Sequence, residues 1–466
     1  MSLRSVADQA AVHLRDGADG RSLDSFAGVP LPDHFDPRMF LGDPRASGVV
    51  ASYERPDQDF ALVAVGEAAR VELAAGESPA AARARALALL DRSPRDGHAT
   101  ATPPLLRPRL LGGFRFAPAD APRAPWEDFA AGSLVLPRML FVLDGLRAGV
   151  VFAPGVSASE ALALVERTIA DRMDSAPDAD PAPLRVAQPI DEPAWRRSVE
   201  VIASEIRAGD YEKAVLATTV ELESDAPLDL GAALARLRAA YPHCHVASFT
   251  AGDSTLLCAS PELLGSVEAG RVRTLGLASS QRRGATLAED DALGRQLLAD
   301  HKSRIEHELV VRSIVERLDG ATDDLEVDAE PGLRRFRNIQ HLATEITGGA
   351  RPGVDILDVV ERLHPTPAVC GRPRDVAREV IHAHEPFDRG WYAGPIGWLG
   401  ANGEGEFAVA LRTALVRGRR ATLFAGNGIV AESQPDAELD EVKLKFRPLA
   451  EALGGVAPSE RSAIPA

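Results

Sequence analysis

The chain has 466 residues, of which 45% are hydrophobic and 26% are charged, and its formal net charge is -16. These values are typical of a soluble globular protein with one large domain or two to three smaller ones. The negative charge argues against a nucleic-acid partner, because phosphates require a basic surface. No run approaches the length of an apolar membrane span, and residues 1–15 lack a signal-peptide core. We therefore expect a cytoplasmic protein without membrane contact.

Cysteine and lysine are both scarce in this sequence. Cys244, Cys258 and Cys370 are odd in number and show no CxxC spacing, so neither a disulfide framework nor a zinc site is expected. Of the 52 lysine and arginine residues, lysine occurs only at positions 213, 302, 443 and 445. An ammonium can lose its proton in a dry site, whereas a guanidinium cannot. Chemistry is therefore one reason for this chain to keep a lysine.

The N-terminal part of the chain predicts a scaffold. Strand-like runs cover 60–65, 133–142 and 149–152, and an Ala-rich helix is expected over 78–90. No catalytic constellation stands out in residues 1–173. A stretch rich in Pro, Asp and Ala follows and indicates a linker. The expected divisions are 1–173 for the scaffold half, 174–191 for the linker, 192–455 for a site-bearing half and 456–466 for a tail.

The site-bearing half opens with an amphipathic helix over 192–208 and a strand that begins at Lys213. The strand has the pattern of one buried on both faces, which turns Lys213 toward the interior. A lysine that extends its ammonium to solvent from a strand end is the structural alternative. A hairpin over 245–260 then leads to Glu262, which Pro261 places on an irregular loop. Such loops often carry catalytic acids.

Two further stretches precede the C-terminal region. Residues 271–284 predict a strand that runs into a turn of small residues, and 289–318 predict one long helix with Glu306 beside its apolar stripe. The sequence HELVV, which starts at His307, is similar to a zinc-protease motif. Because Val311 replaces the second histidine of that motif, zinc is not expected.

Residues 401–445 carry the densest group of candidate residues. We expect a strand over 406–415 with Arg412 in it, a turn at 417–420, a second strand over 421–425 and a Gly-Asn-Gly segment. Gly426 and Gly428 would bring backbone N–H groups close to an anion.

A helix entered at Pro435 completes this region. Glu438, Glu441 and Lys445 stand at i, i+3 and i+7, so two carboxylates and an ammonium share one face of it. Together with Arg412, this face indicates a magnesium ion and a carboxylate ligand held side by side.

Nine segments occur together in one known family. They resemble, in this order, the chorismate-utilising enzymes, and within them the isochorismate synthases: YEKAVLA, ASPE, EHELV, HLAT, HPTPAVCG, EPFDRGWYAGPIGW, ALRTA, FAGNGIV and ELDEVKLK. The resemblance is strong over 194–453 and weaker over 112–142. It implies an α+β class, the chorismate-binding-enzyme fold, with two lobes of stacked antiparallel sheets and peripheral helices.

The resemblance also implies a metal site and a substrate pocket. Glu306 and Glu441 would bind Mg2+, with Glu438 nearby and acting through water, and the metal would hold the ring carboxylate of chorismate. Arg412 and Tyr392 would bind the enolpyruvyl carboxylate. The full set of implied substrate-binding residues is Ser280, His341, Ala368, Tyr392, Arg412, Gly426, Gly428 and Lys445.

The implied reaction is the magnesium-dependent isomerisation of chorismate to isochorismate. A hydroxyl leaves ring carbon 4 while water attacks ring carbon 2, so one group must take a proton and another must give one. Lys213, desolvated and neutral, is the implied base, and Glu262, kept protonated by burial, is the implied acid. A dicarboxylate substrate explains why an acidic protein gathers Arg412, Lys445 and a metal.

Two positions distinguish the reactions within the family. Relatives that attack with their own lysine carry it where this chain has Ala278, and anthranilate synthases carry glutamine at the position of Lys213. The pair in this chain favours water as the nucleophile. Salicylate synthases share the pair, so a salicylate synthase is the first alternative; the sequence does not distinguish menaquinone from siderophore synthesis. A monomer is expected.

Ser279 departs from the family pattern, which has glycine at this place. A side chain there would crowd the substrate or require a different backbone conformation. A non-catalytic homologue that binds chorismate is therefore the second alternative.

Overall fold

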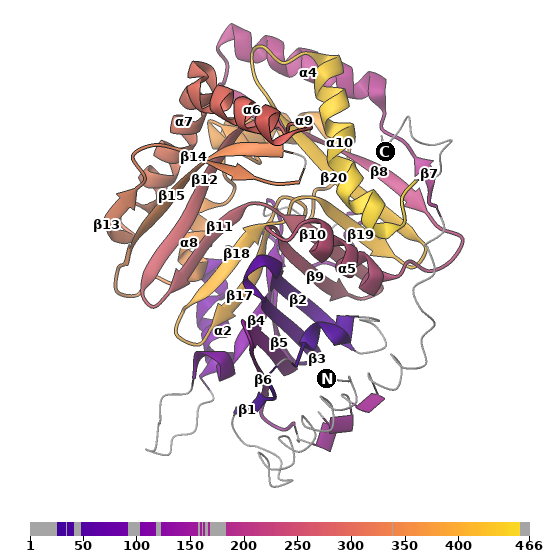
Figure 1. Cartoon of the computed structure of the whole chain (residues 1–466), viewed down its shortest axis with the longest axis vertical. Helices are drawn as coiled ribbons and strands as arrows, with labels where there is room; N and C mark the ends of the chain where they lie inside the picture. The colour runs from indigo at the N-terminus through magenta and orange to yellow at the C-terminus, as the bar shows by residue number, and fades with distance from the viewer. Residues whose placement is uncertain are drawn as a thin grey trace.

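The structure is a computed structural model of the chain, and it describes residues 26–33, 35–41, 48–91, 103–117, 123–156, 159–160, 162–163, 166–167, 183–337 and 339–456. Twenty strands of this described part form one hydrogen-bonded network in which the paired strands are antiparallel (Figure 1). The strands before residue 200 are β1 (Ala27–Leu31), β2 (Val49–Arg55), β3 (Phe60–Leu73), β4 (Arg109–Phe114), β5 (Gly132–Asp144), β6 (Arg147–Phe152) and β7 (Arg185–Gln188).

The remaining strands and the helices, apart from α2, follow after residue 191. The strands are β8 (Lys213–Glu223), β9 (His245–Ala251), β10 (Ser254–Ser260), β11 (Leu263–Glu268), β12 (Arg271–Arg282), β13 (Thr322–Val327), β14 (Gly332–Arg335), β15 (Ile339–Ala350), β16 (Gly371–Arg372), β17 (Pro395–Gly400), β18 (Gly405–Val409), β19 (Thr413–Arg417) and β20 (Arg420–Ile429). The helices are α2 (Arg83–Leu90), α4 (Glu192–Ala208), α5 (Leu230–Ala240), α6 (Leu287–Ala299), α7 (His301–Leu318), α8 (Ile356–Leu363), α9 (Arg374–His384) and α10 (Pro435–Leu453).

The strand network divides into two arms that meet at β5. The first arm runs in the order β5, β3, β2, β9, β10, β19, β20 and β8. The second arm runs in the order β5, β4, β17, β18, β11, β12 and β15. Strands from the N-terminal part thus pair directly with strands from the C-terminal part, β2 with β9 and β4 with β17.

Helices cover the outer ends of both arms. In Figure 1, α6 and α7 lie against β12 and β15 at the end of the second arm, while α10 lies beside β20, with α4 and α5 packed against it. The α+β class with antiparallel sheets and peripheral helices, predicted from the resemblance, is confirmed. None of the helices in the described ranges is both long and apolar enough to cross a membrane.

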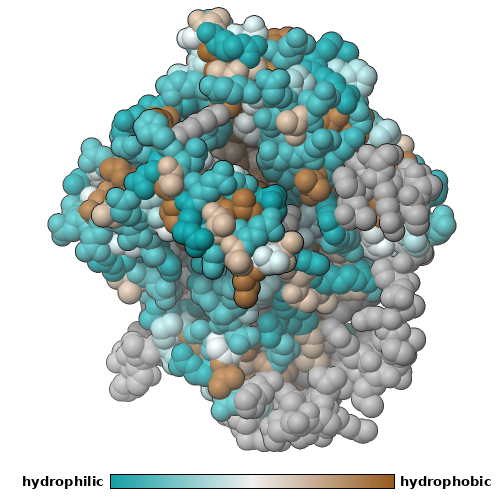
Figure 2. Space-filling view, turned by 45° about the horizontal axis from the view of Figure 1, so that its top comes forward, coloured by the Kyte–Doolittle hydropathy of each residue, from teal (hydrophilic) through white to brown (hydrophobic). Residues whose placement is uncertain are grey.

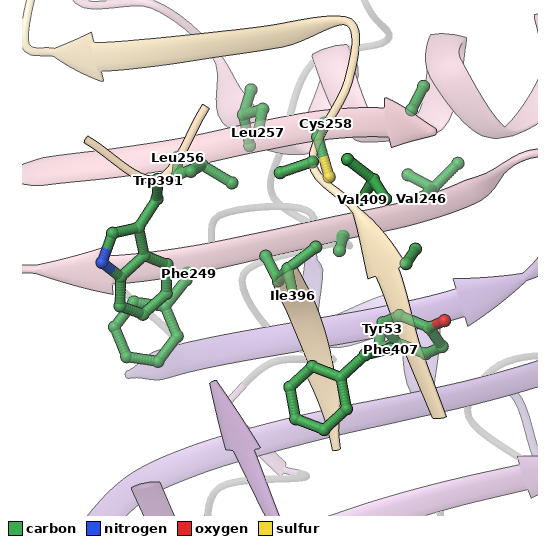
Figure 3. Close-up of a cluster of buried hydrophobic side chains, with 14 of the residues drawn as sticks. Tyr53, Val246, Phe249, Leu256, Leu257, Cys258, Trp391, Ile396, Phe407 and Val409 are labelled. Carbon is green, nitrogen blue, oxygen red and sulfur yellow. The ribbon is translucent and has the colours of Figure 1, made fainter. Parts of the chain in front are cut away.

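A shared apolar core joins the two arms. Figure 3 shows side chains of β9 and β10 in the first arm meeting those of β17 and β18 in the second. The rings of Phe249 and Trp391 are 4.8 Å apart at their centroids. The three cysteines are buried and unpaired, as predicted, and Cys258 lies inside this core. Burial of this kind supplies most of the stabilising free energy of a fold, so the arms are fixed relative to each other.

Local predictions were confirmed where a local signal exists. Helix α4 begins after Asp191, whose side chain accepts from the N–H of Ala194, and ends at Gly209 in the left-handed conformation. Helix α10 begins at Pro435, as expected. The helix expected over 78–90 is a short 3-10 turn (Ala80–Ala82) followed by α2.

Three local predictions were wrong. The strand expected over 406–415 is two strands, β18 and β19, separated at Arg412, whose φ is 48°. The long helix over 289–318 is two helices, because Asp300 leaves the helical conformation and caps α7 with its side chain. The strand expected over 421–425 is longer, because β20 continues through Gly426 and Gly428 to Ile429 and pairs there with β8.

Part of the expected linker over 174–191 is described by the structure. Residues 185–188 form β7, which pairs with the far end of β8, while 174–182 lie outside the described residues. Most of the expected tail, 457–466, also lies outside them. The division of the chain into a scaffold half and a site-bearing half stays a prediction.

Candidate active site

The candidate site lies where the chain passes from one arm to the other. Glu262 stands between β10 of the first arm and β11 of the second, and Arg412 stands between β18 and β19, which belong to opposite arms. Backbone hydrogen bonds hold these two crossings together. The N–H of Ala259 donates to the carbonyl of Arg412 at 3.2 Å, and the N–H of Val409 donates to the carbonyl of Glu262 at 3.0 Å. Two predicted site residues are thus fixed side by side by the sheet itself.

Glu262 is a buried carboxyl group. Its side chain accepts one hydrogen bond, from the hydroxyl of Thr366 at 3.2 Å. Burial raises the pKa of Glu262 to about 7, although the Thr366 hydrogen bond and the charges of Lys213 and Arg412 act in the opposite direction. The group is therefore partly protonated at neutral pH, as a general acid must be.

Lys213 begins β8, as predicted, and its side chain is half-buried. Burial lowers its pKa below the usual value for lysine, and the charges of Glu306 and Glu262 oppose this shift. Within the described ranges its ammonium has no hydrogen-bond or ion-pair partner. A Cβ atom built on Gly428 would lie 2.6 Å from the Cε of Lys213. Gly428 thus leaves the space that the lysine side chain occupies.

A buried ion pair fixes the strand that carries Lys213. The carboxylate of Glu385 accepts from Arg389 at 2.5 and 2.8 Å, and it also accepts from the backbone N–H of Ala217 in β8. Arg389 donates to the carbonyls of Val215 and Val369. Both charges are therefore fully hydrogen-bonded, which is the condition for tolerating them in the interior.

The three glutamates predicted to bind metal differ in their surroundings. Glu438 has both carboxylate oxygens occupied, by the side-chain N–H of Asn427 at 2.9 Å and by the hydroxyl of Ser433 at 2.7 Å. Burial raises its pKa, and the neighbouring charge of Glu441 adds to that rise. Glu438 is held in place by neutral donors.

Glu441 is partly exposed and pairs with Lys445. The two side chains lie one helical turn apart on α10, with their charged atoms 2.8 Å apart. The ammonium of Lys445 also donates to the carbonyl of Gly426 at 2.9 Å and to the side-chain oxygen of Asn427 at 2.8 Å. Lys445 therefore ties α10 to the segment of β20 that the sequence predicted to be in the site.

Glu306 comes from a different helix, α7. Its Oε2 accepts a hydrogen bond from the hydroxyl of Ser279 at 3.0 Å, and the same hydroxyl lies 3.0 Å from the carbonyl of Ser303. Ser279 has a φ of 54° and stands at a bulge in β12, where the pairing with β15 shifts by one residue. Of the two consequences expected for a side chain at this position, the structure shows a changed backbone: Ser279 has the left-handed conformation.

The donor set suits a hard divalent cation. Carboxylate oxygens are the ligands that Mg2+ prefers, and two helices supply three of them here. In the described part of the chain, no three His, Cys, Asp or Glu side chains are gathered as a formed metal centre. Each of the three glutamates is engaged by donors of the protein itself. The three carboxylates are nevertheless the type of ligand that Mg2+ prefers, so these residues fit the metal chemically.

Besides the ammonium of Lys213, two hydrogen-bond donors of the site have no partner within the described ranges, namely the hydroxyl of Tyr392 and the guanidinium of Arg412. The Tyr392 ring is buried and stacks on Phe424, with centroids 5.4 Å apart. Burial raises the pKa of Tyr392, so its hydroxyl stays protonated. A Cβ atom on Gly426 would lie 3.1 Å from that hydroxyl. These free donors are what a carboxylate ligand requires.

Two of the remaining predicted residues lie on the second arm, and Ala368 lies between α8 and β16. Ser280 and His341 are neighbours across β12 and β15, with the hydroxyl 2.9 Å from Nδ1. Burial, aided by the charges of Arg412 and Lys445, lowers the pKa of His341 to about 4, so the ring is neutral. Ala368 lines a small cavity that also touches Glu262.

The face shown in Figure 2 is mostly hydrophilic and is hollowed near the middle of its upper half.

Several contacts of the site were not found by sequence reasoning. Asn427 and Ser433 orient Glu438, Thr366 contacts Glu262, and Ser279 contacts Glu306. For Asn427 a signal existed, since it is a polar residue between two glycines in an apolar strand. The contact of Ser279 with Glu306 joins elements that are distant in the sequence, so no local pattern announces it.

Known proteins are similar to this chain in fold and in sequence. The family model described as chorismate binding enzyme matches residues 31–454. The chain therefore belongs to the chorismate-binding enzyme family, and the resemblance noted in the sequence is confirmed.

Similar proteins within this family include isochorismate synthases. The isochorismate synthase MenF of Bacillus subtilis (strain 168) is 35% identical over 353 residues, which is 75% of each chain. The salicylate biosynthesis isochorismate synthase of Pseudomonas aeruginosa is 37% identical over 361 residues, again 75% of each chain. The solved structure of MenF, the menaquinone-specific isochorismate synthase from Escherichia coli, superposes with a TM-score of 0.77 at 27% identity, covering 97% of this chain and 100% of that one.

Proposed function

We propose that this chain is an isochorismate synthase, which converts chorismate to isochorismate. The observation that carries the proposal is the pair of Lys213 and Glu262. Burial favours the neutral form of each group: it lowers the pKa of Lys213 and raises the pKa of Glu262. A base and an acid with opposed protonation states are what the exchange of one ring hydroxyl for another requires.

The proposed reaction begins with substrate held by its two carboxylates. The guanidinium of Arg412 and the hydroxyl of Tyr392 have no competing partner within the described ranges, and we assign them to the enolpyruvyl carboxylate. Glu306 and Glu441 would hold Mg2+, with Glu438 behind them, and the ion would supply positive charge for the ring carboxylate. Ser280, His341, Ala368, Gly426, Gly428 and Lys445 shape the remainder of the pocket.

The proton transfers balance between the two catalytic residues. Lys213 takes a proton from the water that attacks ring carbon 2, and Glu262 gives a proton to the hydroxyl that leaves ring carbon 4 as water. The C2–O bond forms and the C4–O bond breaks, so the product is an isomer of the substrate. Lys213 ends charged and Glu262 ends as a carboxylate, and proton exchange with solvent resets both. Each transfer contributes on the order of 10²–10⁴ in rate.

The test is product analysis with the purified protein. Incubation with chorismate and Mg2+ should give isochorismate, and the Lys213→Gln and Glu262→Gln proteins serve as matched inactive controls. Salicylate with pyruvate as the main product would identify a salicylate synthase instead. Unchanged chorismate, despite binding, would identify a non-catalytic homologue. A cytoplasmic location, a monomeric state and a role in menaquinone or siderophore synthesis stay predictions.

A further inference from the structure

Ser279 occupies a backbone conformation that favours glycine. Its φ of 54° lies in the left-handed region, which residues with a Cβ atom adopt at a cost in free energy. It stands at the β12 bulge, where the register with β15 shifts between Ala278 and Ser280. A non-glycine residue persists in such a place when its surroundings compensate for the strain. The contacts of the Ser279 side chain supply this compensation.

The hydroxyl of Ser279 contacts α7 at two points. Its oxygen lies 3.0 Å from the backbone carbonyl of Ser303 and 3.0 Å from Oε2 of Glu306. A hydroxyl has one proton to donate, and both neighbours are acceptors, so it is either shared or directed to one of them. The carboxylate is the stronger acceptor, since hydrogen bonds to charged groups are about twice as strong as neutral ones. Ser279 thus connects the β12 bulge to the first two turns of α7.

Glu306 depends on this contact more than its two counterparts depend on theirs. Glu438 has two donors, Asn427 and Ser433, and Glu441 pairs with the ammonium of Lys445. Among the side chains that the structure describes, which do not include that of Lys302 one turn earlier on α7, Glu306 accepts only from Ser279, and it does so through one oxygen. Its other oxygen, Oε1, has no donor in that part of the chain.

We propose that Ser279 is a positioning residue, which holds one oxygen of Glu306 so that the other faces the metal. The inference rests on the proposed role of Glu306 as a metal ligand. Partners that orient a metal ligand in this way typically contribute 10- to 100-fold in metal affinity. The free-energy cost of the left-handed backbone at Ser279 is therefore offset by a hydrogen bond that fixes the carboxylate of Glu306.

Two substitutions separate the side chain from the backbone. Ser279→Gly removes the hydroxyl and the strain, while Ser279→Ala removes the hydroxyl and keeps the strain. Mg2+ binding is measured by calorimetric titration of the substrate-free protein, and thermal unfolding is measured without metal. We expect both variants to bind Mg2+ about 10-fold more weakly. The glycine variant should have the higher Tm of the two.

A double-mutant cycle distinguishes positioning from a general structural effect. In a Glu306→Gln background, Ser279→Gly should cause no further loss of Mg2+ affinity, because the group it positions is no longer a ligand. Ser433→Ala is the matched control: it removes one donor from Glu438 but leaves Asn427, so a smaller loss is expected. A loss that persists in the Glu306→Gln background overturns the inference.

The inference and the proposed function can fail separately. Wild-type protein that makes isochorismate, together with a Ser279→Gly variant of unchanged Mg2+ affinity, overturns the inference and leaves the function intact. Wild-type protein that binds Mg2+ but releases no isochorismate, with weakened binding in both Ser279 variants, supports the inference and removes the function.

Discussion

Two regions of the site are built in opposite ways. The α10 rim, made of Asn427, Ser433, Glu438, Glu441 and Lys445, is a closed network in which each charged group has a partner. The pocket floor consists of Lys213, Glu262, Tyr392 and Arg412. Its only described side-chain hydrogen bond is the one from Thr366 to Glu262.

The difference assigns separate tasks to the two regions. Partners fix the position of a charged group, which suits residues that must hold a ligand. Burial without partners costs free energy of folding and shifts pKa values, which suits residues that must exchange protons. The rim is therefore where we expect effects on metal binding, and Lys213 and Glu262 of the floor are where we expect effects on the chemical step. Tyr392 and Arg412 of the floor keep the carboxylate-binding role proposed above.

The largest effect is expected on the floor. Glu262→Gln keeps an oxygen for the Thr366 hydroxyl but has no proton to give the leaving group. We expect the turnover number and the specificity constant to fall together by about 10²–10⁴, with chorismate binding retained. Steady-state kinetics checks this. A rise in KM alone would move Glu262 from the chemistry to binding and would erase the contrast between the two regions.

The next effect tests the rim as a binding region. Glu441→Ala removes one proposed ligand and releases Lys445, so the Mg2+ concentration for half-maximal rate should rise at least about 100-fold, while the Tm stays near that of the wild type. Titration of activity with Mg2+ gives the number. Full wild-type activity in excess chelator would contradict a metal role for the rim.

The same floor residue makes a prediction about stability. Glu262 has a pKa of about 7 in the folded protein and an ordinary, lower pKa when unfolded. The folded state therefore binds more protons between pH 4.5 and 7, and stability is lost as the pH rises through this window. The loss is about 3 kcal/mol, from 1.36 kcal/mol per pKa unit. Glu262→Gln should be more stable than the wild type at pH 8 and similar at pH 4. Denaturant unfolding of the metal-free protein at both pH values decides this.

The smallest effect belongs to a partner within the rim. Ser433→Ala removes one of the two donors to Glu438 and the hydroxyl that accepts from the N–H of Val430. We expect a loss of about 1 kcal/mol in the free energy of unfolding and little change in turnover number, because Asn427 still holds the carboxylate. A large fall in turnover would mean that the rim takes part in the chemical step.

Features with a local cause were predictable from the sequence. Helix α4 has its capping aspartate and its terminal glycine, and α10 has Pro435 and a face of spaced charges. Lys213 stood out because lysine is rare in this chain. Arg412 and Glu262 were singled out from the sequence as candidate site residues. Their position where the chain passes between the two arms could not be predicted, because it depends on which strands pair across the whole fold.

The errors have the same origin. Apolar periodicity continues through Asp300, so the break between α6 and α7 was hidden although an aspartate is a good helix cap. The second strand was expected to end at 425, before the two glycines, yet pairing with β8 keeps Gly426 and Gly428 in β20. Ser279 was expected to crowd a ligand, and only the folded chain brings its hydroxyl to Glu306.

The pairing of β8 with β20 also has a consequence for how the protein is made. The edge of β8 over residues 214–223, directly after Lys213, waits for a partner strand that leaves the ribosome roughly two hundred residues later, which at 5–20 residues per second is about 10–40 s. During that time the nascent chain exposes a long apolar strand edge, and such edges favour aggregation. Lys213, one of the two proposed proton-transfer residues, thus lies on an unpaired strand edge until β20 is made. A chain cut short before β20 should therefore be a substrate for chaperones and proteases instead of a partly active enzyme.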